Sequence, residues 1–246
     1  MTRHLLPLLA ALGLWLIAPQ AALALQEQAL PLPAQAIISQ TIGRDDTAYH
    51  AKVQEEGIQL QNPRHNLKAT FTPEGLQVRT PKGAFELRYL GLSYGSTTHQ
   101  AQKVTPKAQA NRIEYPRGPL TEWYINGPKG LEQGFTLKAP PGPPGGTLTL
   151  TLEITGIKAR PAEGGLILGS GLAYRDLVAW DAEGRILPAE LKLQGKTLTL
   201  AVDDRKARYP IHIDPFIQQA KLTASDGAAF DEFGFSVAIS GDTVVV

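Results

Sequence analysis

The feature that most constrains this chain is an alternation of apolar and polar residues with a period of two. In residues 147–154, TLTLTLEI, leucine or isoleucine occupies every second position, and threonine or glutamate stands between. Successive side chains of a strand point to opposite faces, so this spacing predicts a half-buried strand. The alternation recurs in residues 85–89, 134–137, 197–202 and 211–213. Strands are therefore predicted along most of the chain from about Ala48 onward.

Short turn sequences separate the predicted strands, among them TPEG, NGPKG, DAEG and LQGK. The 24 glycines and 19 prolines would interrupt long helices repeatedly, and no segment after residue 24 has the apolar stripe of an amphipathic helix of three turns. We therefore predict an all-β chain in which residues 48–216 form an antiparallel β-sandwich. The sequence PPGPPGG at 140–146 is predicted to be a stiff loop, and a division of the sandwich into two halves there is left open.

The first 24 residues have the layout of a secretory signal peptide. Arg3 and His4 precede an apolar run over residues 5–18, and residues 22–24, ALA, have the small-x-small form that a signal peptidase cleaves. We expect cleavage before Leu25 and an exported product. An apolar helix of about 14 residues spans about 21 Å, short of a bilayer core of about 30 Å, so no stable membrane anchor is expected after cleavage.

Residues 25–47 are expected to form a linker between the signal and the sandwich. Pro31 and Pro33 lie in QALPLPAQ, where they remove backbone donors and disfavour a helix. The linker is therefore predicted to be extended.

Charge and cysteine content exclude several classes of partner and chemistry. The 24 basic and 23 acidic residues leave no charge surplus, so we expect neither nucleic acid nor an acidic membrane surface as a partner. The chain has no cysteine, which excludes disulfides, thiol catalysis and lipid attachment to an N-terminal cysteine.

Residues 91–95, GLSYG, match the G-x-S-x-G pattern of a serine hydrolase nucleophile. Such a serine needs a following helix that supplies an oxyanion-hole amide, but the next residues, STTHQAQKVTPKAQANR, are polar and contain Pro106. The alternation is expected to place Ser93 on the buried face of a strand. A triad of Ser93, Asp176 or Asp204, and His212 can still be drawn on paper. We expect that the protein is not an enzyme. The alternative is a secreted serine hydrolase that uses the GLSYG motif.

The acidic residues that stand out are Asp181 with Glu183, Asp203 with Asp204, and Asp214. Adjacent strand residues point to opposite faces, so Asp203 and Asp204 are not expected to form an acid–base pair. We predict that these carboxylates bind backbone amides in turns and at strand ends. No catalytic residue is assigned.

Histidine and tryptophan are the remaining candidates for binding. The histidines beyond the signal are His50, His65, His99 and His212. They lack the spacing of metal ligands, and His212 is expected to point to solvent, so no metal site is predicted. Trp123 and Trp180 are predicted to be core or corner residues. A carbohydrate-binding module around Trp123 is a second alternative.

Residues 218–246, QQAKLTASDGAAFDEFGFSVAISGDTVVV, resemble the opening of a bacterial FG-GAP repeat, the β-propeller blade unit that also occurs in integrin α chains. Phe233 and Gly234 match the FG pair, and FSVAISGDTVVV is similar to two blade strands that turn at residues 240–242. The GAP tripeptide of the family would follow Val246. The resemblance implies that residues 217–246 are the start of a repeat blade. This blade is incomplete, because it contains a single hairpin, and the β-propeller is therefore expected to be truncated.

Residues from 48 onward are also similar to the β-rich N-terminal part of exported FG-GAP repeat proteins, in LTEWYINGPKGLEQGFTL, LVAWDAEGRILPAEL and VDDRKARYPIHIDPF. This resemblance implies a non-catalytic protein, secreted, at the cell surface or in the periplasm, that serves adhesion or scaffolding by binding an unknown extracellular protein or surface ligand. Blades of the family often bind calcium through a D-x-D-x-D-G loop, but Asp226, Asp231 and Glu232 lack that spacing. No cofactor is expected, and calcium is expected only in propeller blades missing from this chain.

Overall fold

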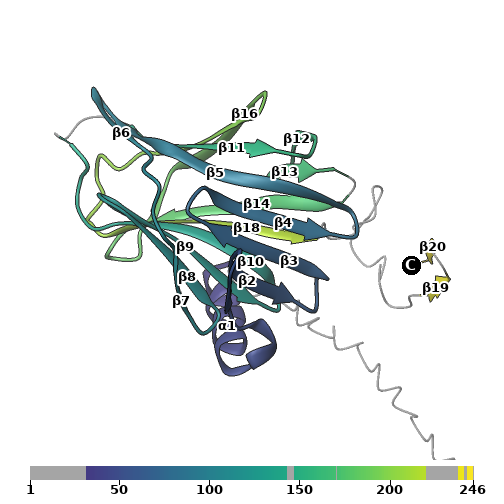
Figure 1. Cartoon of the computed structure of the whole chain (residues 1–246). Helices are drawn as coiled ribbons and strands as arrows, with labels where there is room; N and C mark the ends of the chain where they lie inside the picture. Colours follow the sequence, from purple (N-terminus) through teal and green to yellow (C-terminus); the bar gives the residue numbers. More distant parts are fainter. Residues whose placement is uncertain (1–31, 143–146, 170, 220–237, 241–242, 246) are drawn as a thin grey trace, which may run out of the picture. The chain divides into compact units, whose positions relative to one another are not determined.

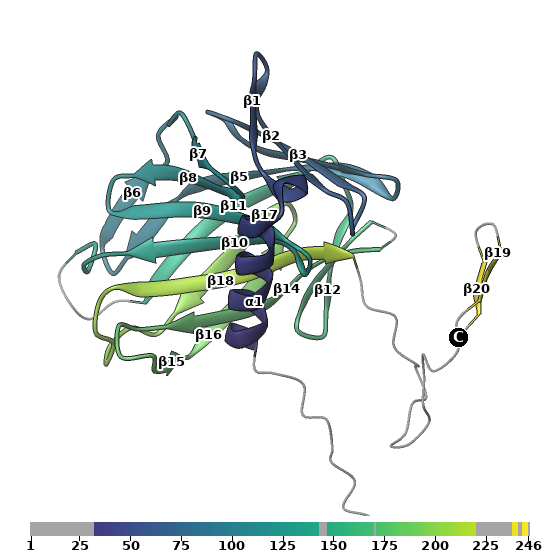
Figure 2. The same cartoon turned by 90° about the horizontal axis from the view of Figure 1, so that it is seen from below.

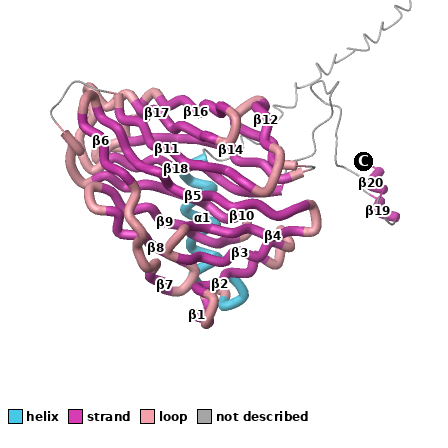
Figure 3. The backbone as a smooth tube through the Cα atoms, turned by 45° about the horizontal axis from the view of Figure 1, so that its top comes forward, coloured by secondary structure: helices cyan, strands magenta, loops and turns pink. Residues whose placement is uncertain are grey.

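Strands make up nearly all of the regular structure of this chain (Figures 1 and 3). The computed structural model describes residues 32–142, 147–169, 171–219, 238–240 and 243–245. The predicted signal peptide lies outside these residues, as does most of the segment that resembles the FG-GAP repeat.

Two antiparallel sheets form an open, sandwich-like arrangement, as the alternation predicted. Sheet A contains β1 (Lys52–Gln54), β2 (Gly57–Asn62), β3 (Leu67–Thr72), β4 (Gly75–Thr80), β5 (Gly83–Tyr94), β6 (Thr97–Gln100), β11 (Leu148–Thr155), β16 (Ala189–Gln194) and β17 (Thr197–Val202). Sheet B contains β7 (Lys107–Gln109), β8 (Arg112–Arg117), β9 (Leu120–Gly127), β10 (Gly130–Leu137), β12 (Ala159–Ala162), β13 (Gly165–Leu168), β14 (Leu172–Trp180), β15 (Ile186–Leu187) and β18 (Ile211–Gln219).

The strand order of sheet A is β1-β2-β3-β4-β5-β11-β17-β16, with β6 paired to β5. The order of sheet B is β12-β13-β14-β18-β10-β9-β8-β7, with β15 paired to β14. Each sheet therefore joins strands from both sides of the predicted loop at 140–146; the strand before it, β10, lies in sheet B and the strand after it, β11, lies in sheet A. One hydrophobic core contains residues of both sheets, and the strands do not separate into two halves at this loop.

The core follows from the period-two pattern. In β11 the side chains of Leu148, Leu150 and Leu152 are fully buried, while the threonines between them are half-buried on the other face. The predicted turns TPEG, NGPKG, DAEG and LQGK all connect or follow strands. These predictions are confirmed. A half-buried strand can be predicted from sequence because its apolar and polar residues alternate regularly.

The predicted extended linker is wrong for residues 32–45, which form the helix α1 (Leu32–Asp45), followed by the short 3₁₀ helix η1 (Thr47–Tyr49). Pro33 is the second residue of α1, and the first turn of a helix needs no backbone donor there, so this proline is compatible with the helix. Neither α1 nor η1, the helices of the described residues, could span a lipid bilayer.

Helix α1 packs small residues against the outer face of sheet B (Figure 2). Ala36 and Ser39 are buried, and a Cβ atom added to Gly43 would lie 2.0 Å from the carbonyl oxygen of Asn126. A Cβ on Gly127 of β9 would lie 2.3 Å from the carbonyl oxygen of Ser39. The backbones of helix and strand are therefore in direct contact.

Asparagine side chains connect this helix with both sheets. Asn111 Nδ2 donates to the carbonyl oxygens of Gln40 in α1 (3.1 Å) and of Asn126 (2.7 Å). Asn62 Nδ2 in sheet A donates to Asn126 Oδ1 in sheet B at 2.9 Å, and Asn126 Nδ2 donates to Tyr49 O at 3.0 Å. These buried amides satisfy backbone groups where chain segments converge, so we assign them a structural role.

A separate hairpin consists of β19 (Ala238–Ser240) and β20 (Thr243–Val245), which pair in antiparallel register. Its strands lie within the segment expected to form two blade strands that turn at residues 240–242.

Candidate functional site

Ser93 lies near the end of β5, and the structure corrects its expected position. The pairing of β5 with β11 shifts register at a bulge beside Leu90, because Thr151 pairs with Gly91 whereas Leu152 pairs with Tyr89. One extra residue reverses the alternation beyond it. Leu92 and Tyr94 therefore enter the core, and Ser93 is half-buried on the outer side. The prediction that Ser93 faces the core is wrong.

The GLSYG motif leads into β6, not into a helix. Ser93 pairs with Thr98 of β6 and Thr149 of β11. His212 of sheet B stands between Ile211 and Ile213, which are both fully buried, so its ring lies on the outer face of that sheet. The core of the sandwich therefore separates Ser93 from His212, so the candidate catalytic triad that contains these two residues is not assembled.

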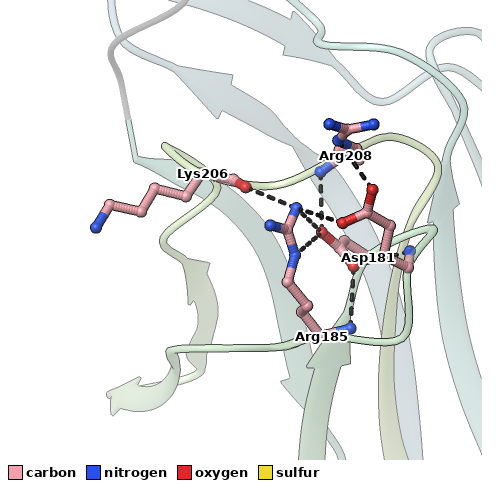
Figure 4. Close-up of polar contacts among 5 residues, drawn as sticks. Asp181, Arg185, Lys206 and Arg208 are labelled. Atoms are coloured by element: carbon pink, nitrogen blue, oxygen red, sulfur yellow. Dashed lines mark hydrogen bonds and ion pairs between the residues drawn. The ribbon is translucent and has the colours of Figure 1, made fainter.

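Asp181 organises a turn and a neighbouring loop (Figure 4). Its side chain is fully buried and accepts hydrogen bonds from the backbone amides of Glu183, Arg185 and Arg208, each at 3.0 Å. Arg185 also forms an ion pair with Asp181 at 2.7 Å, and Arg185 Nη2 donates to the carbonyl oxygen of Lys206. The amide of Arg208, then the Arg185 guanidinium, hold the pKa of Asp181 well below its ordinary value. The predicted turn role of Asp181 is confirmed.

Asp203 and Asp204 follow the last residue of β17; the predicted bond to a backbone amide is confirmed for Asp203, whereas Asp204 binds a tyrosine hydroxyl instead. Asp203 Oδ1 accepts from the amide of Arg205 at 3.2 Å, and Asp204 Oδ2 accepts from the hydroxyl of Tyr209 at 2.6 Å. The Arg205 side chain lowers the pKa of Asp203 to about 2. These carboxylates brace the loop that leads into β18.

Asp214 does not have the predicted strand-end role, because it lies inside β18 and is 5% exposed. It hydrogen-bonds to Glu132 of β10, which is 1% exposed and accepts from Gln40 Nε2 of α1 at 2.7 Å. Burial, and then the neighbouring Glu132, raise the pKa of Asp214 well above its ordinary value, and burial also raises the pKa of Glu132. The pair can hold a proton between its oxygens.

Lys129 lies beside this pair of acids. Its Nζ is 3.7 Å from Asp176 Oδ2 and 4.1 Å from the centre of the Phe216 ring. Within the described residues this Nζ has no hydrogen-bond partner, although it is buried. Four charged residues therefore form one cluster beside α1: Lys129, Glu132, Asp176 and Asp214. Asp214 belongs to the last strand of the sandwich, β18.

A second buried polar network lies inside the core. Arg117 Nε donates to Glu122 Oε2 at 2.5 Å, and Tyr124 donates to Glu122 Oε1 at 2.6 Å. Gln133 Nε2 donates to Glu122 and to Tyr124, and Tyr174 donates to Gln133 Oε1 at 2.7 Å. Burial raises the pKa values of Tyr124 and Tyr174, so both phenols stay protonated as donors. Every member has a partner, which is the pattern of a structural network.

The aromatic residues of sheet B do not form an open platform around Trp123. This ring is 4% exposed, covers Gly134, and donates from Nε1 to Thr136 Oγ1 at 3.0 Å. The predicted buried position of Trp123 is confirmed. Trp180 is half-buried and stacks on His212 with ring centres 5.3 Å apart. His212 is thus partly covered, and burial lowers its pKa.

The other histidines contact backbone carbonyl groups. Nε2 of His50, His65 and His99 lies 2.8, 3.0 and 2.9 Å from the carbonyl oxygens of Arg44, Pro128 and Pro141, respectively. In the part of the chain that the structure describes, no group of three or more acidic, histidine or cysteine residues could hold a metal ion. Asp226, Asp231 and Glu232 lie outside that part.

An open groove of about 950 Å³ lies along β16, where the edges of the two sheets approach each other. Residues of β12, β13, β14 and β17 form its other walls. Leu177, Leu191 and Leu193 pack against the core and give the groove its apolar part, while Glu190 and Lys192 are exposed. This volume is in the range of ordinary binding sites, so the groove is a candidate interaction site.

The FG-GAP repeat family model matches residues 216–246. The match begins inside β18, a strand with neighbours on both sides in sheet B, and it includes β19 and β20. Neither the curated proteins nor the solved structures compared with the chain gave a match.

Sequence reasoning missed the two buried polar clusters. Glu122, Tyr124 and Asn126 share one face of β9, and Gln133 occupies a core-facing position of β10. Polar residues at positions that alternation assigns to the core are the signal that could have found the Glu122 network. Glu132 and Asp214 alternate with the core residues Leu131 and Ile213 and so carry no such signal.

Proposed function

We propose that this chain is the N-terminal β-sandwich module of an exported FG-GAP repeat protein, and that it serves binding or scaffolding outside the cytoplasm without catalysis. The observation that carries the proposal is the position of the repeat match, which begins at Phe216 within β18. The sandwich and the repeat share residues 216–219, so no linker separates them in the sequence. A propeller that continued from this strand would be held at a fixed point of the sandwich.

The non-catalytic part of the proposal rests on how the reactive groups are used. Ser93 and His212 lie on the outer faces of different sheets, and Asp181 and Asp203 are engaged in turns. The Glu132–Asp214 pair lies under α1, where Gln40 contacts Glu132. These polar groups have structural partners or lie far apart, which supports a non-catalytic role.

Export is tested by the N-terminus of the protein isolated from its producing cell. The gene is expressed with a C-terminal tag, and the tagged protein is recovered separately from the cytoplasm and from outside it. We expect the outer fraction to begin at Leu25, and an Ala24→Arg variant to remain uncleaved. Recovery of the uncleaved chain from the cytoplasm alone would contradict export.

Binding is tested with the purified, fluorescently labelled chain and intact cells of the strain that produces it. We expect saturable binding that unlabelled chain displaces and that prior protease treatment of the cell surface abolishes. Linear, non-displaceable binding would contradict a role as a binding module.

The hydrolase alternative is tested with p-nitrophenyl acetate. The wild type, Ser93→Ala and Ser96→Ala are compared, because Ser96 is an exposed serine of the adjacent turn and provides a matched control. We expect the three proteins to be indistinguishable from buffer. An activity that Ser93→Ala abolishes and Ser96→Ala leaves intact would overturn the non-catalytic proposal.

A further inference from the structure

The edge strand β16 differs from the other edges of the two sheets. β1 and β7 have 3 residues each, β6 and β12 have 4 each, β15 has 2, and β16 has 6. β12 also contains Pro161, which has no backbone donor. Short strands and prolines protect sheet edges from pairing with other chains. β16 has neither feature, and it pairs with β17 over six residues without a bulge.

The hydrogen-bonding phase of β16 identifies the groups on its free side. Asp203 N donates to Pro188 O at 2.9 Å, one position beyond the pair Ala189–Val202. Hydrogen-bonded and non-hydrogen-bonded pairs alternate in an antiparallel ladder, so Ala189, Leu191 and Leu193 direct their backbone groups away from β17. Among the described residues, no other strand pairs with this side of β16.

The side chains of β16 are complementary to a second copy of the same strand. In an antiparallel pair centred on Leu191, this residue lies opposite the partner's Leu191, and Ala189 lies opposite the partner's Leu193. These are the residues whose backbone groups are free, so the ladder can form in this register. Glu190 then lies opposite the partner's Lys192 on the solvent face, twice by symmetry. Opposite charges in such cross-strand positions stabilise a sheet.

The apolar side of the strand fits the same arrangement. Leu191 and Leu193 are half-buried and line the groove of about 950 Å³. Pairing at the edge would place the partner's Leu191 beside Leu191 and the partner's Ala189 beside Leu193. Glu190 and Lys192 are 60% and 66% exposed and form an ion pair with each other at 2.8 Å within one chain, so both are available to exchange partners.

We propose that β16 is a homodimerisation edge, at which two copies of this chain join sheet A to sheet A in antiparallel register about Leu191. The proposal goes beyond the binding role of the module, because it names a second copy as the partner and Glu190–Lys192 as the pair that sets the register. It does not depend on the FG-GAP repeat.

Charge reversal tests the register. Sedimentation equilibrium of the purified chain is measured from about 1 µM to about 1 mM, the range of weak and standard interfaces. We expect a reversible dimer that Lys192→Glu weakens about tenfold, since carboxylates then lie opposite each other. The double variant Glu190→Lys/Lys192→Glu restores the opposite charges and should dimerise as the wild type does. A monomeric wild type, or a double variant as weak as the single one, would overturn the proposal.

Cross-linking tests the location. The chain has no cysteine, so one introduced cysteine forms a disulfide only with a second chain. Opposed residues of an antiparallel ladder are within disulfide range, so Leu191→Cys should give a covalent dimer on mild oxidation. Val53→Cys, at the 77% exposed position of the edge strand β1, is the matched control and should stay monomeric. Absence of the Leu191→Cys dimer, or equal cross-linking of the control, refutes pairing at β16.

Discussion

Glu132 of β10 and Asp214 of β18 share a hydrogen bond although both carry carboxyl groups and both are buried. Two carboxylates cannot both ionise at low cost in such a site, so one proton is retained between them. Lys129, Asp176 and Arg112 contribute further charges that act on the pair, and Gln40 donates to Glu132 from α1. The free energy of unfolding therefore depends on the protonation of the Glu132–Asp214 pair.

The Asp214→Asn variant is expected to change the pH dependence of stability. A carboxyl whose pKa is raised in the folded state binds its proton more tightly there, so its contribution is present at low pH and is lost as the pH rises above its unfolded pKa. Each unit of the shift corresponds to about 1.4 kcal/mol. The amide of the variant can still donate to Glu132 but does not titrate in this range.

Urea unfolding at about pH 4.5 and about pH 7.5 measures this effect. The wild type should lose more stability than Asp214→Asn between these values. Asp203→Asn is the control, because the pKa of Asp203 is lowered to about 2 and its titration ends below this window. Equal pH slopes for the wild type and Asp214→Asn would contradict a retained proton.

Gly43→Ala is expected to destabilise the chain although alanine favours helices. In an exposed helix this change would add about 1 kcal/mol of stability. Here the new Cβ would lie 2.0 Å from Asn126 O, so α1 must move away from β9. We expect a loss of about 1–3 kcal/mol and faster hydrogen exchange of the amides in α1. Thr41→Ala, at an exposed position of the same helix, should be neutral or stabilising; a stabilised Gly43→Ala would refute the close contact.

Arg117→Met is expected to cost about 3–5 kcal/mol, because it leaves the carboxylate of Glu122 buried without its ion pair. Arg88→Met is the matched control, since Arg88 also pairs with a glutamate, Glu153, but is 46% exposed. A surface pair of this kind contributes about 1 kcal/mol or less. Chemical unfolding of both variants gives the comparison, and similar losses would contradict the structural role of the buried network.

The strands could be predicted because a half-buried strand alternates regularly, as in residues 147–154. Helix α1 could not, because from Ala36 onward its buried residues are Ala36, Ser39 and Gly43, while Ile37 and Ile42 are 62% and 45% exposed. A search for an apolar stripe fails to identify such a helix, because its large apolar side chains are exposed and its buried residues are small. The small residues are needed for a close approach that only the tertiary structure reveals.

The orientation of Ser93 depends on one extra residue. The bulge beside Leu90 reverses every later side chain of β5, and no local composition marks it apart from Gly91. A Cβ on Gly91 would lie 2.6 Å from His99 O, so this glycine is required where β6 approaches. The predicted strand-end position of Asp214 is wrong for a different reason: a proline follows it in HIDP, but the strand continues through Pro215 to Gln219.

We expect the sandwich to be one folding unit whose last strand, β18, contains the start of the segment that matches the FG-GAP repeat model. The direct test is the thermal midpoint of chains that end at Phe216, at Gln219 and at Val246. Ile217 is fully buried and pairs with Leu131 and Tyr174, so the expected sandwich end at Phe216 cuts into the core. We predict that the chain ending at Gln219 unfolds cooperatively within about 2 °C of the longest chain, and that the chain ending at Phe216 unfolds about 5–15 °C lower. Failure of the Gln219 chain to fold, or equal midpoints for Phe216 and Gln219, would contradict this account.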